Sequence, residues 1–158
     1  MGAPDLRLGR YGLGARTGTT ALNINDCVAA VWNPHATKDL NIILMTFART
    51  ANVVGCYAQR ITTRGTPGST VTGDIDNDFD RLLAPISGLE LNLAAFSVQP
   101  TRAAPDYFRF MPTQNNPGPT QELYFGEDGL KIPAGTGLGL FQTTGTAGSG
   151  DISVVWDE

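Results

Sequence analysis

The chain has 158 residues, a formal net charge of −4 and only 16% charged side chains, against roughly 25% in an ordinary soluble domain. Its hydrophobic share of 41% argues against a disordered chain, and no run approaches the roughly 18 apolar residues that a transmembrane helix needs. The scattered basic residues argue against a nucleic-acid binder, which would carry a basic stripe.

The first 20 residues differ from the rest, because glycines and arginines alternate there with large apolar side chains. The residues leave two interpretations open, a frayed terminus or an extended arm that orders on a partner. In the second interpretation, the contacting residues are Leu6, Arg7, Leu8, Arg10, Tyr11, Leu13 and Arg16. We therefore expect a flexible N-terminal arm over residues 1–20 and a single β-sandwich domain over residues 21–158.

From residue 20 onwards, short apolar or alternating runs are separated by Gly, Pro and Asn turns, a pattern typical of an all-β sandwich or barrel. The expected strands lie within 21–32, 40–47, 53–64, 89–98, 107–111, 122–125, 129–132, 138–142 and 152–156. The glycine series at 135, 137 and 139 lacks the spacing of a phosphate-binding loop. It predicts a tight turn into a closely packed strand.

One short helix is expected over residues 74–84. Its apolar face consists of Ile75, Phe79, Leu82 and Leu83, at helical spacing. Asp74 is a suitable N-cap, and Pro85 ends the helix.

The candidate chemical groups predict no enzyme, no cofactor and no metal site. The aspartates at 74, 76, 78 and 80 do not fit an EF-hand calcium loop, which needs Gly at its sixth position. The single histidine, His35, lies in a turn signal, and no nucleophile motif accompanies it. Cys27 and Cys56 are expected to be buried free thiols, with one disulfide as the alternative in an oxidising compartment.

Four segments carry a resemblance to a known family: VWNPHATKDLNIILMTFART, RITTRGTPGST, FGEDGLKIPAGTGLGLFQT and the closing VVWDE. Together they resemble small virion proteins of tailed bacteriophages, namely capsid decoration (cement) or minor structural proteins. The glycine-rich entry to a late strand also resembles jelly-roll domains that form trimers. The resemblance implies a jelly-roll-like antiparallel β-sandwich of about eight strands.

The same resemblance implies a non-enzymatic protein, made in the host cytoplasm, that stabilises the exterior of the capsid. Its expected partners are the major capsid protein and itself, as a homotrimer at capsomer junctions. Nucleic acid, membranes and small-molecule substrates are not expected. The alternative is a trimeric adhesin or fibre-tip domain that binds a host glycan or receptor through the polar loops 65–73, 112–121 and 143–151.

Overall fold

The computed structural model describes residues 10–17, 20–51, 55–72, 75–76, 88–111, 120–143 and 146–158, which form strands and no helix. The strands are β1 (Arg10–Arg16), β2 (Thr20–Leu22), β3 (Cys27–Trp32), β4 (Leu40–Ala51), β5 (Cys56–Ile61), β6 (Ser69–Val71), β7 (Ile75–Asp76), β8 (Glu90–Leu93), β9 (Arg102–Met111), β10 (Gln121–Tyr124), β11 (Leu130–Ile132), β12 (Gly137–Gln142) and β13 (Thr146–Asp157).

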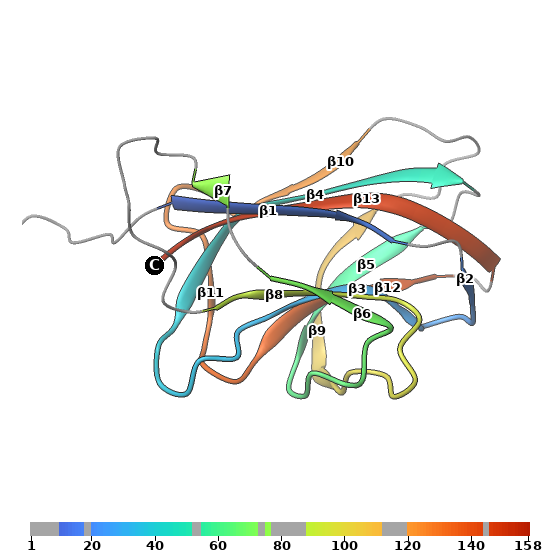
Figure 1. Cartoon of the computed structure of the whole chain (residues 1–158), viewed down its shortest axis with the longest axis horizontal. Helices are drawn as coiled ribbons and strands as arrows, with labels where there is room; N and C mark the ends of the chain where they lie inside the picture. The colour runs from blue at the N-terminus through green and yellow to red at the C-terminus, as the bar shows by residue number, and fades with distance from the viewer. Residues whose placement is uncertain are drawn as a thin grey trace, which may run out of the picture.

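The strands form two antiparallel sheets that pack face to face as a β-sandwich (Figure 1). The first sheet has the order β10-β4-β13-β1-β7, with β11 also paired to β4 and β2 to β13. The second has the order β6-β8-β3-β12-β5-β9. The expected all-β antiparallel sandwich is confirmed. The strands outside the expected ranges are β1, β6 and β7, and the expected range 21–32 contains both most of β2 and all of β3. Strands β6 and β7 have only three and two residues, too few to give a periodic signal.

The main core lies between the two sheets. Alternate residues of β1 and β13, including Tyr11, Val154 and Trp156, point inwards from the first sheet. Leu138 and Leu140 of β12 meet them from the second sheet and are fully buried. Each fully buried side chain of this size contributes about 1.5–3 kcal/mol through removal of apolar surface from water.

The outer side of the second sheet is covered by the chain's own connections. Phe96, in the connection from β8 to β9, packs with Ile61 and Phe141 in a second apolar cluster. The connections at 62–68 and 94–101 are joined by a β-bridge between Thr66 and Val98. This second layer of cover explains why every residue of β12 is buried.

The glycine series before β12 behaves as expected. Gly135 has a φ of 66° in the turn, and β12 begins at Gly137, where the backbones of neighbouring strands approach closely. Glycine permits both the left-handed turn conformation and the close approach. The predicted turn into a tightly packed strand is therefore confirmed.

The predicted helix over 74–84 lies mostly outside the described residues. Its two described positions, Ile75 and Asp76, form β7, which pairs with Gly12 and Tyr11 of β1. The helix prediction is wrong at these two positions. The available hydrogen-bond partners on β1 outweigh a local helical spacing, because helical propensity is only a weak prior.

The arm prediction is wrong for its second half. Residues 10–16 are strand β1 of the first sheet, paired along their whole length with β13 from Arg10–Asp157 to Arg16–Asp151. The segment reads Tyr11-Gly-Leu13-Gly-Ala15, so apolar side chains alternate with glycines and can face the core. Residues 1–9 of the predicted arm lie outside the described residues.

Candidate functional site

The predicted contact residues fall into three groups in the structure. Leu6, Arg7 and Leu8 lie outside the described residues. Tyr11 and Leu13 are 2% and 8% exposed and belong to the core, so they do not present a surface to a partner. Arg10 and Arg16 are exposed and lie on the outer side of the first sheet.

That outer side is the surface we call the open face. It consists of the side chains that alternate with the core residues of four adjacent strands. They are Glu122 and Tyr124 of β10; Leu44, Thr46 and Ala48 of β4; Asp151, Ser153, Val155 and Asp157 of β13; and Arg10, Gly12, Gly14 and Arg16 of β1. The sheet continues past β1 to β7, which Figure 1 draws beside the start of β1, and Gly12 is itself buried.

At each end of the open face, an ion pair joins β1 to β13. Arg10 donates two hydrogen bonds to Asp157, with Nε–Oδ1 and Nη2–Oδ2 distances of 2.9 and 3.0 Å. Arg16 donates two to Asp151, with distances of 2.6 and 3.1 Å. The two described arginines of the predicted contact, Arg10 and Arg16, are thus already paired within the chain.

Between the ion pairs, the open-face side chains of β4 and β13 are uncharged, whereas Glu122 of β10 is exposed. Thr46 and Ser153 share a hydrogen bond of 2.6 Å between their hydroxyl oxygens. Leu44 and Val155 are opposite each other and partly buried, and Tyr124 is 54% exposed. A protein neighbour can cover the uncharged part of this surface without burying an unpaired charge in a low dielectric.

The hydrogen bond from Arg16 lowers the pKa of Asp151 below its ordinary value of 3.8. A depressed carboxylate pKa contributes stability above the unfolded pKa and loses it as the pH falls through the folded pKa. We expect an NMR carboxyl titration to place the midpoint of Asp151 below 3.8, and Arg16→Gln to return it to that value. An unchanged midpoint in the variant would mean that the ion pair does not form in solution.

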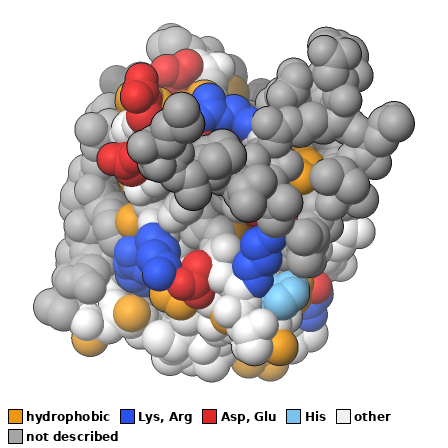
Figure 2. Space-filling view, turned by 90° about the vertical axis from the view of Figure 1, so that its left-hand side faces the viewer, with side chains coloured by type: hydrophobic (Ala, Val, Ile, Leu, Met, Phe, Trp, Pro, Cys, Tyr) orange, Lys and Arg blue, Asp and Glu red, His pale blue; other side chains and the backbone are white. Residues whose placement is uncertain are grey.

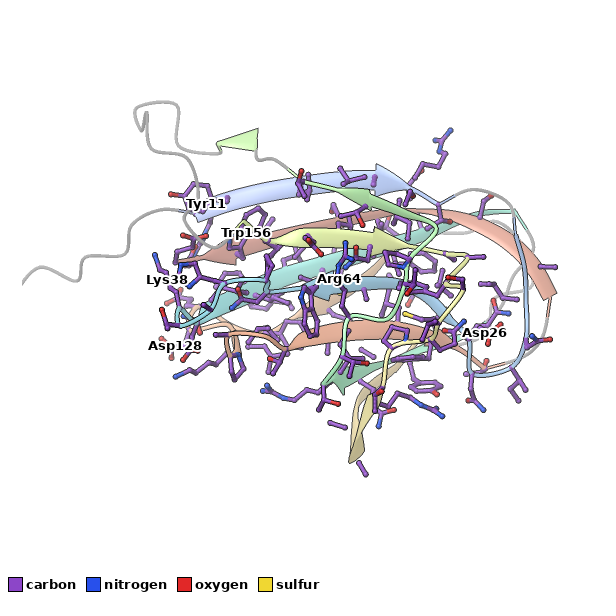
Figure 3. The ribbon with its side chains drawn as sticks, turned by 60° about the horizontal axis from the view of Figure 1, so that its bottom comes forward. Tyr11, Asp26, Lys38, Arg64, Asp128 and Trp156 are labelled. Carbon is purple, nitrogen blue, oxygen red and sulfur yellow. The ribbon has the colours of Figure 1, made fainter. Side chains whose placement is uncertain are left out.

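Figure 3 shows Tyr11 and Trp156 together at one end of the sandwich, with Lys38 nearby. The rings of Tyr11 and Trp156 lie 5.6 Å apart. Glu158, whose side chain is fully buried, accepts hydrogen bonds from Trp156 Nε1 and Lys38 Nζ, both at 3.3 Å. These contacts fix the last residues of β13 and so hold that end of the open face in place.

His35 has a structural role in its turn. Its Nδ1 accepts backbone hydrogen bonds from Thr37 and Lys38 at 3.1 and 2.8 Å. Asn33, which is fully buried, bonds the same turn through Lys38 O at 2.8 Å. Through these hydrogen bonds the His35 side chain holds the conformation of the turn before β4.

Both cysteines are buried free thiols. Cys27 packs in the outer cluster of the second sheet with Phe141, whereas Cys56 belongs to the main core. Burial raises the pKa of Cys27 well above 9.0. The two cysteines form no disulfide with each other.

We expect the two thiols of the folded protein to resist labelling by a disulfide reagent at pH 8, because only exposed thiolate reacts. Labelling of both thiols should follow global unfolding in urea, with the fully denatured chain as the control. Rapid labelling of the native protein would contradict the burial of these residues.

In the described part of the chain, no group of three or more His, Cys, Asp or Glu side chains could hold a metal ion. At the end of the sandwich seen in Figure 2, the coloured acidic and basic side chains are interspersed. No described helix is long and apolar enough to cross a membrane. The most distinctive surface in the described residues is therefore the open face.

Sequence reasoning missed the open face as a unit. Its strands are widely separated along the chain, so no local window contains it. The alternation Asp151-x-Ser153-x-Val155 was the signal available within β13. It could not reveal that β1, β4 and β10 lie beside it.

Comparison of the chain with known proteins identifies no relative. No protein-family model matches the chain, and no curated protein and no solved structure matches it significantly. Function must therefore be argued from the fold and the open face.

Proposed function

We propose that this chain is a non-enzymatic structural protein of a tailed-bacteriophage virion. It decorates the exterior of the capsid as a trimer at capsomer junctions and stabilises the shell. Its partners are the major capsid protein and other copies of itself. It acts by covering surface rather than by chemistry.

The strand order bears on the fold that the proposal assumes. A jelly roll numbered in chain order has one sheet 1-8-3-6 and the other 2-7-4-5. With β1, β3, β4, β5, β9, β10, β12 and β13 as the eight strands, the sheets here contain β1-β13-β4-β10 and β3-β12-β5-β9. Double-sheet jelly rolls of eight strands occur in viral capsid and lectin domains. The order supports the jelly-roll part of the assignment.

The chemistry of the open face favours a role in assembly rather than a role in sugar binding. Its arginines are paired within the chain, so a protein neighbour can cover them without separating charges. Among the side chains that the structure describes, Tyr124 is the only exposed aromatic residue, although sugar sites rely on aromatic stacking. Since one fold hosts many functions, this surface weighs more than the fold alone.

The experiment uses shells assembled without this protein and measures their melting temperature by scanning calorimetry as purified protein is added. A protein that binds only the intact shell stabilises it by mass action, by about 2.7 kcal/mol per site at 100 times the dissociation constant. We expect a saturable rise in the melting temperature. No rise at saturation, combined with glycan binding by the isolated protein, would replace the proposal with the adhesin alternative.

A further inference from the structure

Arg102, at the start of β9, differs from the arginines of the open face because its side chain has no acidic partner. Arg10 and Arg16 each bind an aspartate through Nε and Nη2, the two nitrogens along one edge of the guanidinium. Arg102 instead donates from Nη1 to the hydroxyl of Tyr57, at 2.5 Å, and forms no ion pair with any residue that the structure describes. Arg102 is exposed. Its Nε–Nη2 edge is therefore open to a carboxylate from outside the chain, in the bidentate geometry that suits a guanidinium.

Buried groups hold the guanidinium of Arg102 in place. Its Cζ lies over the ring of Phe141, 5.5 Å from the ring centroid. The ring of Tyr57 stacks on Phe141 with the centroids 5.6 Å apart, and its hydroxyl donates to Asn25, in the turn between β2 and β3, at 3.0 Å. Both rings are buried, at 3% and 1% exposure. A cation that is positioned before binding loses little side-chain freedom when a partner binds it.

Two exposed apolar side chains belong to the same part of the surface. Ile24, in the turn between β2 and β3, and Val98, in the connection from β8 to β9, are 60% and 59% exposed. They are two of the three large hydrophobic side chains that are exposed among the described residues. The turn and the connection are joined where Gln99 Oε1 accepts a hydrogen bond from the backbone nitrogen of Cys27 at 2.8 Å. We call Ile24, Val98 and Arg102 the arginine patch.

The arginine patch lies apart from the open face. It belongs to the second sheet and its connections, whereas the open face belongs to the first sheet. Figure 3 places Asp26, in the same turn as Ile24, at the end of the sandwich opposite Trp156. The carboxylate of Asp26 is bound within this turn, where it accepts a hydrogen bond from Asn23 N at 2.7 Å. The positive charge of the patch therefore stays unpaired within the turn.

We propose that the arginine patch is the surface through which this chain binds the major capsid protein, with an aspartate or glutamate of that protein on the Nε–Nη2 edge of Arg102. This inference rests on the proposed function and adds to it the surface and the chemistry of the contact. Charge complementarity selects the partner group, because a fixed and unpaired cation fits a carboxylate. Apolar side chains beside that carboxylate cover Ile24 and Val98. They exclude water from the ion pair, which strengthens it.

The first test measures, by co-sedimentation, the dissociation constant of the full chain from shells assembled without it. Arg102→Gln removes the charge, whereas Arg102→Lys keeps the charge but loses the planar fork that binds a carboxylate through two parallel hydrogen bonds. Lys131→Gln is the matched control, because Lys131 is also an exposed cation but is already paired with Asp39 at 2.7 Å. Circular dichroism and thermal melting verify that each variant is folded.

We expect Arg102→Gln to weaken shell binding by about tenfold or more, Arg102→Lys to weaken it less, and Lys131→Gln to stay within about twofold of the wild type. If Arg102→Gln bound as tightly as the wild type, or lost no more affinity than Lys131→Gln, the arginine patch would be overturned and the proposed function would stand. A wild type that does not bind shells at all would contradict the proposed function and the patch with it.

The second test is the salt dependence of the same binding, measured from about 50 mM to about 500 mM sodium chloride, a range over which screening increases strongly. Affinity of the wild type should fall as the salt concentration rises, because salt screens the approach of the carboxylate to Arg102. We expect Arg102→Gln to lose less affinity over this range, and Lys131→Gln to follow the wild type. The same salt dependence in all three proteins would contradict an ion pair at Arg102.

Discussion

Trp156→Ala is expected to lower the free energy of unfolding by about 3–5 kcal/mol, the range for truncating a large buried aromatic side chain. Trp156 is fully buried, packs against the ring of Tyr11 at a tilt and donates a hydrogen bond to Glu158. Its removal leaves a cavity at the end of the core and a buried carboxylate with one donor fewer. Urea denaturation monitored by far-UV circular dichroism measures the loss.

Val155→Ala is the matched control, because Val155 is the preceding residue of the same strand and points to the open face. It should cost no more than about 1 kcal/mol, as partly exposed positions do. If Trp156→Ala cost as little as Val155→Ala, β13 would not be packed as described.

Gly137→Ala is expected to destabilise the protein by about 1–3 kcal/mol, the usual cost of overpacking. A Cβ at this position would overlap the carbonyl oxygen of Val31 and lie 3.1 Å from the side chain of Ile61. Because β12 is paired on both sides, with β3 and with β5, it cannot shift away from one strand without pressing on the other. Thermal and urea denaturation measure the effect.

Gly14→Ala distinguishes this steric effect from the general effect of replacing a strand glycine. Gly14 also lies within a paired strand, but an added Cβ has room there. Alanine in a strand is favoured over glycine by about 0.5–1 kcal/mol, so this variant should be as stable as the wild type or more so. Equal destabilisation by both variants would rule out the close approach at Gly137 as the cause.

The expectations that held were those with a local physical signal. The apolar run at 40–47 lies inside β4, and the run at 152–156 lies inside β13. The turn at Gly135 was recognised because glycine is the residue that adopts a positive φ without strain. These features are encoded within a few neighbouring residues.

Features set by distant contacts could not be predicted in this way. Tyr11 and Leu13 looked like anchors for a partner, because their actual partner, β13, lies at the other end of the chain. The open face has the same origin, since its four strands meet only in the folded sheet. The order of its side chains across the four strands follows from register, which no local window supplies.

The most direct measurement of the central claim is an electron cryomicroscopy map of shells incubated with saturating protein. The account predicts density for a two-layered β-sandwich on the outer surface, repeated at the junctions between capsomers. Shells that carry no such density at saturation would contradict the role in capsid decoration.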